Sequence, residues 1–392
     1  MMDNYRFSAD FPRVFRFIVM MFFAVFPRLL LSPLLLRISA DLGISYDQAS
    51  SFFLTSAVGF SLGLITSGFI ACRLTHHYTI LSGALMTGIS LFLLSTVTSF
   101  PLFHLFMGLL SYSNGLYHGS GFASVTRIVP DRFRTRALSF HEMGPNAAFI
   151  LAPIFSALMA PVLGWRGVLC ATGIAAFGAA LFFLLSDKGP NDCGAPPNFA
   201  SIRLFASVPE YWILLLLIAI SVSLATGVFS VLPTYLQVEH NLPERMLNTL
   251  IGFSRVTGFA SIYLAGHLAD RFGYRIVLAS ILLFTSVLTV LIGFVSGPLL
   301  LVVVFLQPAV TQSFFPAALS AVTRIAKPEA RNLAVSLAIP LSNILGGGLT
   351  PMAFGTAGAA GYFSISFIVL GSLGILSVLL LRSLPATIRE RC

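Results

Sequence analysis

The sequence is poor in charge and in cysteine, and both shortages narrow the class of protein. Only 9% of the 392 residues are charged, whereas 57% are hydrophobic. A chain this apolar is not expected to fold as a water-soluble domain around a single core. Its composition is typical of a membrane protein. The four cysteines stand at positions 72, 170, 193 and 392 without C-x-x-C or metal-ligand spacing. They indicate neither a disulfide framework nor a zinc site.

Motifs for ATP-driven or hydrolytic chemistry are also missing. The chain has no P-loop, no G-x-S-x-G and no cluster of metal ligands. We therefore expect no enzymatic activity, no metal and no cofactor. The formal net charge of +9 could indicate a nucleic-acid partner. In a chain this apolar, however, the basic residues are better interpreted as topology signals, so no nucleic acid is expected.

Long apolar runs fill the sequence instead. A helix that crosses a bilayer needs about 20 mainly apolar residues. By that criterion the sequence predicts twelve transmembrane helices, at 14–37, 49–72, 79–98, 101–126, 137–160, 165–186, 211–237, 246–266, 276–296, 298–323, 332–356 and 361–384. The first run is as long as a full span, so it is expected to be an uncleaved helix rather than a signal peptide. The fold class is an all-α membrane protein.

The basic residues predict the orientation of these helices. If the N-terminus is cytoplasmic, 18 of the 23 Lys and Arg residues lie on that side, as the positive-inside rule requires. Both termini are then cytoplasmic, and we expect a monomer in the inner membrane of a bacterium. A polar segment rich in Pro, Gly and Asn predicts a linker at 187–210 between six-helix domains at 1–186 and 211–392.

An internal duplication supports this division. "ASVTRIVPDRFRTRALSFHEMGPN" from Ala123 aligns with "SAVTRIAKPEARNLAVSLAIPLSN" from Ser320 at an offset of 197, and "GFIACRLTHHYTIL" from Gly68 aligns with "GHLADRFGYRIVL" from Gly266 at an offset of 198. An even number of spans separates the repeats, so they share one orientation. Parallel repeats predict a pseudo-two-fold axis along the membrane normal and a central cavity between the halves.

The second copy of this loop resembles a family signature. "GHLADRFGYR" is similar to the G-x-L-A-D-R-x-G-x-R loop of the major facilitator superfamily, which implies a transporter that works by alternating access. The resemblance implies a gating motif made of Gly266, Asp270, Arg271, Gly273 and Arg275. The first copy keeps Gly68 and Arg73 but has Cys72, Thr75 and His77 where the family has Asp, Gly and Arg. A purely structural role for Asp270, neutralising the cluster, is the alternative.

Two arginines lie within predicted spans. Burying an arginine in a bilayer costs about 2.5–3.5 kcal/mol, so each requires a partner or a water-filled cavity. At 1.5 Å per residue, Arg255 lies roughly 13 Å and Arg28 about 9 Å below the outer face. Glu142 is the only acid within a span, and it lies about 10 Å deeper. Two guanidinium groups at one level without a carboxylate fit an anionic substrate, because their donors match a carboxylate or phosphonate.

The arginine in span eight also resembles the monocarboxylate and oxalate/formate branch of the superfamily. That resemblance implies that Arg255 binds a substrate carboxylate. Ile251 replaces the acid that precedes this arginine in the eukaryotic carriers, so the same route of proton coupling does not follow. The alternatives are structural: Arg28 could extend toward Asp41 or Asp47 at the membrane surface, and Arg255 could bond backbone carbonyls at a helix break.

Other polar residues on the predicted pathway are neutral or titratable. The candidate substrate ligands besides the arginines are Asn114, Tyr117, His118, Gln312 and Asn343. His141 and Glu142 could couple transport to protons, because a His–Glu group changes protonation across physiological pH. Alternatively Glu142 pairs with Arg73, Arg127 or Arg134 at a cytoplasmic gate.

Together these observations predict a secondary transporter of a small organic anion of the carboxylate type, coupled to protons and embedded in the lipid bilayer. A proton-driven exporter of drugs or metabolites is the alternative within transport, with Glu142 carrying the proton. A membrane sensor that transports nothing is the alternative from another class.

Overall fold

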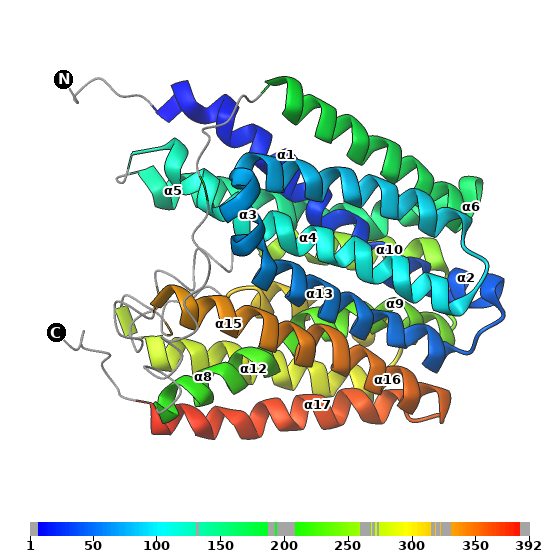
Figure 1. Cartoon of the computed structure of the whole chain (residues 1–392). Helices are drawn as coiled ribbons and strands as arrows, with labels where there is room; N and C mark the ends of the chain where they lie inside the picture. Colours follow the sequence, from blue (N-terminus) through cyan, green and yellow to red (C-terminus); the bar gives the residue numbers. More distant parts are fainter. Residues whose placement is uncertain are drawn as a thin grey trace. The chain divides into compact units, whose positions relative to one another are not determined.

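The computed structural model describes residues 7–130, 133–186, 193, 208–258, 268, 271–272, 274–314, 318, 322 and 331–384, and the statements below concern these residues. Every regular element among them is a helix (Figure 1). The long helices carry apolar side chains around most of their circumference, as helices surrounded by lipid and by one another do. The predicted all-α fold is thus confirmed.

The helices correspond to the predicted spans, often in two pieces. In chain order they are α1 Phe7–Leu29, α2 Leu31–Leu42, α3 Tyr46–Thr96, α4 Phe100–Ile128, α5 Arg134–His141, α6 Met143–Ser186, α8 Pro209–Val222, η3 Ser223–Gly227, α9 Val228–Val238, α10 Glu244–Ser254, α12 Tyr274–Phe294, α13 Gly297–Thr311, α15 Arg331–Asn343, η5 Ile344–Leu349, α16 Thr350–Ala359, α17 Phe363–Ser377 and η6 Val378–Ser383. Seven helical segments, two of them 51 residues long, are apolar and long enough to cross a membrane among the described residues.

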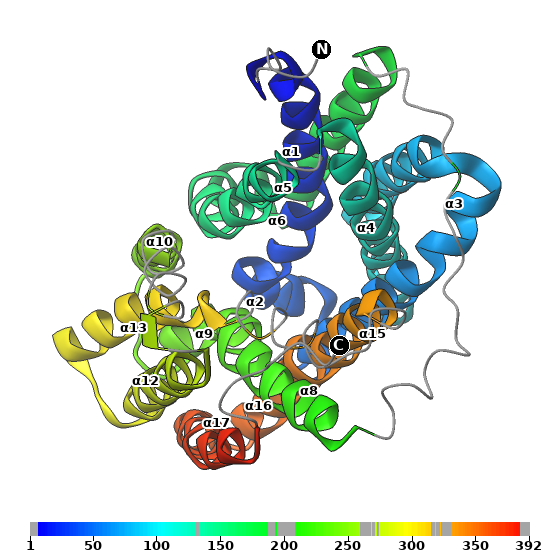
Figure 2. The same ribbon diagram turned by 90° about the vertical axis from the view of Figure 1, so that its left-hand side faces the viewer.

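The chain divides into two compact units. Unit 1 comprises Met1–Leu34 and Val58–Pro197, and unit 2 comprises Leu35–Ala57 and Asn198–Cys392. Within each unit the helices run side by side (Figure 2). The predicted halves at 1–186 and 211–392 remain a prediction, and most of the linker at 187–210 lies outside the described residues.

In unit 1, α1 packs against α4 and α6. Close approach depends on small residues: a Cβ on Gly144 of α6 would lie 2.8 Å from the backbone oxygen of Ile18 in α1, and a Cβ on Gly115 of α4 would overlap the carbonyl oxygen of Phe60 in α3. Helices in lipid gain little from hydrophobic burial against one another, so such backbone contact is a main source of their cohesion.

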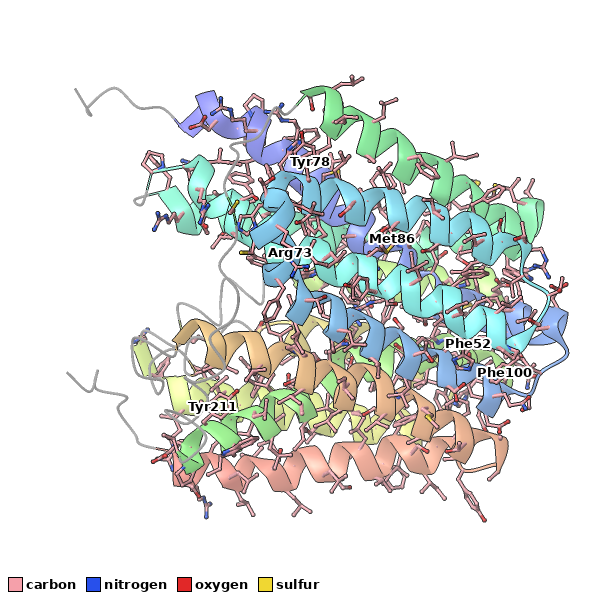
Figure 3. The ribbon with its side chains drawn as sticks, viewed as in Figure 1. Phe52, Arg73, Tyr78, Met86, Phe100 and Tyr211 are labelled. Carbon is pink, nitrogen blue, oxygen red and sulfur yellow. The ribbon has the colours of Figure 1, made fainter. Side chains whose placement is uncertain are left out.

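The two 51-residue apolar segments each contain a sharp kink. In α3 it falls at Thr75 (φ 72°, ψ 162°), and in α6 at Gly164 (φ 65°, ψ 171°). Arg73 and Tyr78 mark the two sides of the first kink in Figure 3. Each kink reverses the chain between two predicted spans, so spans two and three, and spans five and six, are the two arms of one bent element.

In unit 2 two short π-helices interrupt the spans. η3 separates α8 from α9, and η5 separates α15 from α16. They touch each other through glycine: a Cβ on Gly227 would lie 2.8 Å from the carbonyl oxygen of Gly346. Because a π-helix shifts the hydrogen-bond ladder by one residue, it leaves main-chain carbonyls available to side chains.

Candidate functional site

Arg28 lies beside a break in the first span of unit 1. Pro33 lacks the N–H that would bond the carbonyl of Leu29, and the helix is interrupted between α1 and α2. The Arg28 guanidinium carbon lies 4.7 Å from the ring centroid of Phe60 in α3. Within the described part of the chain this guanidinium makes no hydrogen bond. Its in-plane donors are therefore available to a ligand, while its face rests on the ring.

His118 meets the same aromatic ring from α4. Its imidazole contacts Phe60 edge-on, with ring centroids 4.9 Å apart, and its Nδ1 lies 3.1 Å from the carbonyl oxygen of Asn114. Since that oxygen can only accept, Nδ1 donates and Nε2 remains for another partner. The Asn114 side chain is 1% exposed, and neither end of its amide has a hydrogen-bond partner among the described residues. Arg28, Phe60 and His118 are thus in contact, with Asn114 one helical turn from His118.

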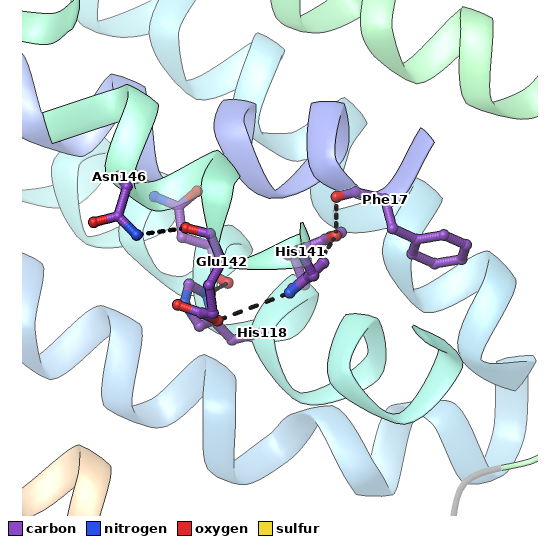
Figure 4. Close-up of polar contacts among 7 residues, drawn as sticks. Phe17, His118, His141, Glu142 and Asn146 are labelled. Atoms are coloured by element: carbon purple, nitrogen blue, oxygen red, sulfur yellow. Dashed lines mark hydrogen bonds and ion pairs between the residues drawn. The ribbon is translucent and has the colours of Figure 1, made fainter. Parts of the chain in front are cut away.

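Tyr117, His141 and Glu142 form a second group in unit 1; His141 and Glu142 are labelled in Figure 4. The Tyr117 hydroxyl donates to the carbonyl oxygen of Phe17 over 2.7 Å and lies 3.0 Å from Nε2 of His141. Nδ1 of His141 lies 3.9 Å from Glu142 Oε1. Asn146 secures the backbone here by donating to the Glu142 carbonyl over 2.7 Å. The group joins the end of α5 to α4 and α1.

Among the described residues, Glu142 takes no arginine partner. Its carboxylate lies 3.9 Å from Nδ1 of His141, and Arg134 donates to the carbonyl oxygen of Thr126 over 3.0 Å. Arg73 is exposed.

In unit 2, Arg255 lies where α10 ends. The hydrogen bonds from Arg255 N to Gly252 O and from Gly258 N to Arg255 O span three residues instead of four, so the ladder tightens and the predicted continuous span 246–266 is interrupted. The Arg255 side chain is 4% exposed; Nη2 donates to Ala225 O over 3.3 Å, and the guanidinium carbon lies 4.7 Å from the Phe229 ring centroid. This is the geometry of the structural alternative, a bond to a backbone carbonyl at a helix break.

The π-helix η3 explains why that carbonyl accepts. Ala225 lies within η3, as does Leu224, whose carbonyl oxygen accepts from Nε2 of Gln307 over 2.7 Å. Arg255 and Gln307 thus bind neighbouring carbonyls that the π-helix exposes. Sequence reasoning did not single out Gln307, because nothing in the sequence marked η3 as a π-helix.

Asn248 was also missed. It lies in α10 two turns before Arg255, is 0% exposed, and has no hydrogen-bond partner at either end of its amide within the described residues. Such a group costs about 1–3 kcal/mol when buried and unsatisfied. The sequence feature that could have identified Asn248 is its position as a polar residue at the start of an apolar span.

The remaining predicted ligands have helix contacts. Oε1 of Gln312 lacks a partner among the described residues and lies where a Cβ on Gly258 would be. Nδ2 of Asn343 is 3.4 Å from Ala57 O. Three residues of the gating loop, Gly266, Asp270 and Gly273, lie outside the described residues. Of the others, Gly68 is half-buried, Arg275 is half-buried, and Arg271 is exposed beside the ring of Phe272.

Comparison with known proteins establishes the class. The model of the Major Facilitator Superfamily matches residues 17–265 and 246–391, and the chain belongs to this family. It is a membrane transport protein for a small molecule, not an enzyme. Among described residues no three His, Cys, Asp or Glu side chains are grouped to hold a metal.

Individual relatives are more distant. The chain is 28% identical over 166 residues to the "Probable hexose phosphate transport protein" of Chlamydia pneumoniae, which covers 40% of this chain and 35% of that protein. The chain thus matches about a third of that relative's length. Two solved structures share its fold at 15% identity and a TM-score of 0.81. One is a D-xylose-proton symporter (97% of this chain, 99% of that one); the other, a bacterial homologue of the human lysosomal transporter Spinster (97% of both chains).

Proposed function

We propose that the protein is a secondary transporter of a small organic anion, driven by the proton gradient. The proposal is carried by Arg28: a permanently charged group in a membrane span whose hydrogen-bond donors have no protein acceptor within the described residues. An ion in that position needs a counter-charge, since insertion alone costs about 2.5–3.5 kcal/mol. A substrate carboxylate or phosphate group provides one and accepts two parallel N–H bonds.

A neutral group in unit 1 suits the rest of such a solute. Asn114, one helical turn from His118, offers a buried donor and a buried acceptor without a partner among the described residues. In unit 2, Arg255 already donates to Ala225, and we assign it to anion binding only when it leaves that carbonyl. A donor–acceptor distance of 3.3 Å is slightly longer than the usual range for such a bond, which favours exchange for a charged acceptor.

The charged group of the solute is either a carboxylate or a phosphate ester. The span-eight arginine resembles carboxylate carriers, whereas the curated relative is named for hexose phosphate. Both anions accept hydrogen bonds in the plane of a guanidinium, so this geometry does not distinguish them. The transport assay does. The acid that couples to the proton is proposed to be Glu142, next to His141.

Uptake into proteoliposomes tests this function. Radiolabelled monocarboxylates, dicarboxylates, a sugar phosphate and a lipophilic cation are offered with and without an inward proton gradient. We expect one class of anion to accumulate, and Arg28→Lys to raise its KM at least tenfold, because an ammonium cannot form the paired bonds. Arg255→Lys should raise KM by less if Arg255 serves mainly η3.

Arg13→Lys is the matched control on the same helix. Arg13 is exposed and forms its ion pair with Asp10, one turn away, so its replacement should leave KM unchanged. Anion uptake with an unaltered KM in both Arg28→Lys and Arg28→Ala would contradict the proposal, and so would transport of the lipophilic cation alone.

A further inference from the structure

The proton positions around His141 follow from which atoms can donate. The Tyr117 hydroxyl has one proton and two neighbours, the carbonyl oxygen of Phe17 at 2.7 Å and Nε2 of His141 at 3.0 Å. A carbonyl oxygen can only accept, so the tyrosine proton points to Phe17. Nε2 of His141 must then carry a proton and donate it to the tyrosine oxygen.

The other ring nitrogen is left as an acceptor in neutral His141. An imidazole without charge carries one proton, which Nε2 holds, so Nδ1 has only its lone pair. Nδ1 is buried without a hydrogen-bond partner among the described residues, and it lies 3.9 Å from Oε1 of Glu142. If Glu142 is a carboxylate, two acceptors face each other with no proton between them. A buried acceptor in this state costs about 1–3 kcal/mol.

We propose that His141 Nδ1 and the Glu142 carboxylate form a binding site for a single proton. Water supplies the proton, and the site holds it either as an imidazolium beside a carboxylate or as a neutral imidazole beside a carboxylic acid. No covalent bond other than the N–H or O–H bond is made. The role of this site in transport rests on the proposed function; the binding of the proton does not.

The exposure of the two side chains indicates how the proton enters the site, and the hydrogen bond of Tyr117 indicates where its transfer ends. The side chain of Glu142 is 46% exposed and that of His141 is 0% exposed, so the proton arrives through Glu142. Beyond His141, Tyr117 is held by the Phe17 carbonyl, which cannot pass a proton on. The site therefore stores a proton and does not conduct it. Its state acts on three elements at once, because α5 contributes His141, α4 contributes Tyr117 and α1 contributes Phe17.

The charged and titratable groups around the site come from α4 and α1 among the described residues. The titratable neighbours of His141 are Tyr117 and His118 on α4 and Glu142 beside it, and His118 interacts electrostatically with both His141 and Arg28 of α1. α3 contributes the Phe60 ring, which both Arg28 and His118 contact. Because His118 interacts with both Arg28 and His141, an anion bound at Arg28 would change the electrostatic environment of His141. His118 thus links the proton site to the solute.

Nitrogen-15 NMR of the full chain labelled at histidine tests the proton site directly. The His141 signals are assigned by their loss in His141→Gln. In the wild-type protein we expect Nε2 to stay protonated at every pH and Nδ1 to gain its proton in one step as the pH falls. In Glu142→Gln the new amide N–H donates to Nδ1 permanently, so this protonation step should disappear while the Nε2–H form persists.

His104→Gln is the matched control, because His104 lies on α4 against Phe100 and outside this group; the His141 signals should not change. A wild-type spectrum with the neutral proton on Nδ1, or a Glu142→Gln spectrum with an unchanged protonation step, would overturn the site. The wild-type spectrum decides the point even if Glu142→Gln does not fold. Loss of gradient-driven accumulation with retained anion exchange in Glu142→Gln supports its role in coupling. If the protonation step is observed but no anion is transported, the result contradicts the proposed function and not the proton site.

Discussion

At the residue scale, each unit contains an arginine whose guanidinium packs over the face of a phenylalanine ring. Arg28 lies over Phe60, and Arg255 over Phe229, each at 4.7 Å. The ring attracts the positive charge through its π face, whereas the N–H donors point outward in the guanidinium plane. An aromatic ring can therefore orient the guanidinium without using its N–H donors. The arginine then loses less conformational entropy when it binds a ligand.

Phe60→Leu should weaken anion binding although Phe60 touches no anion itself. The change removes a cation–π contact worth about 0.5–2 kcal/mol, and since 1.4 kcal/mol is tenfold, KM should rise by roughly two- to thirty-fold. The maximal rate should change less, because Arg28 itself is retained. Phe60→Tyr keeps the ring and should keep the wild-type KM. Equal KM values for Leu and Tyr would show that the ring does not orient Arg28.

The sequence indicated the charged members of these groups and the polar residues Asn114, Tyr117 and His118, but not Phe60 or Asn248. Arg28, Arg255 and Glu142 stood out because a charge in an apolar run is costly. Phe60 is one of 37 phenylalanines, so no pattern distinguishes it. Asn248 lies near the start of its span, where polar residues are common. Contact between helices, which a single sequence does not contain, gives Phe60 its role, and burial without a hydrogen-bond partner among the described residues distinguishes Asn248.

At the element scale, the kink in α3 carries backbone strain at Thr75. Its φ of 72° with ψ of 162° lies in a region that glycine enters freely and a β-branched residue does not. The family loop has a glycine at this position, and the structure keeps the glycine conformation with threonine in it. Such strain costs on the order of 1–3 kcal/mol.

Thr75→Gly should therefore stabilise the protein. The relief of strain is offset in part by the greater freedom of glycine in the unfolded chain, about 0.4–1 kcal/mol, so a net gain of roughly 1 kcal/mol is expected. Thermal unfolding in detergent measures it as a higher Tm. Thr75→Ala removes the side chain but keeps a Cβ, and should gain little. A Tm for Thr75→Gly at or below that of Thr75→Ala would contradict the assignment of strain.

Span positions were predictable and the interruptions within them were not. Hydropathy placed the seventh span at 211–237, and α8, η3 and α9 together occupy 209–238. The same pattern predicted an unbroken eighth span, yet α10 ends at Ser254. Hydropathy measures the length of an apolar run and is insensitive to the hydrogen-bond ladder. The hydroxyl of Ser254, which bonds the Ile251 carbonyl, and that of Thr257 alter the ladder locally.

At the scale of the whole molecule, glycines at the helix crossings of each unit can be compared at the offset of the predicted duplication. In unit 1 the glycine that yields space is Gly115, which admits the backbone of Phe60; in unit 2 it is Gly258, which admits the side chain of Gln312. Phe60 and Gly258 are equivalent at the offset of 198 residues, as are Asn114 and Gln312. In unit 1 the other helix carries glycines as well, because Cβ atoms on Gly59 and Gly63 of α3 would overlap carbonyl oxygens of α4.

An ion pair ties the N-terminal segment of unit 2 to the rest of that unit. Arg37 of α2 and Glu244 at the start of α10 lie 207 positions apart and form three charge-assisted contacts: Nε to Oε1 at 3.0 Å, Nε to Oε2 at 3.2 Å and Nη2 to Oε2 at 2.7 Å. The pair is partly exposed, with 36% and 21% of the side chains accessible. Solvent screening limits an exposed pair to about 0–1 kcal/mol, and bidentate geometry places this one at the upper end.

The charge swap Arg37→Glu with Glu244→Arg tests whether this pair holds the segment Leu35–Ala57 within unit 2. Each single change puts two like charges together, so each should lower the Tm of the purified protein and, if the pair must form in every transport cycle, the rate of uptake. The double swap restores opposite charges and should recover most of both losses, with a coupling energy on the order of 1 kcal/mol in the double-mutant cycle. The neutral pair Arg37→Gln with Glu244→Gln is the control, since it removes attraction and repulsion together and should lie between the single changes and the wild type. If the two single losses simply add in the double swap, the contact has no energetic role. Recovery of Tm without recovery of uptake would restrict that role to stability and exclude it from the transport cycle.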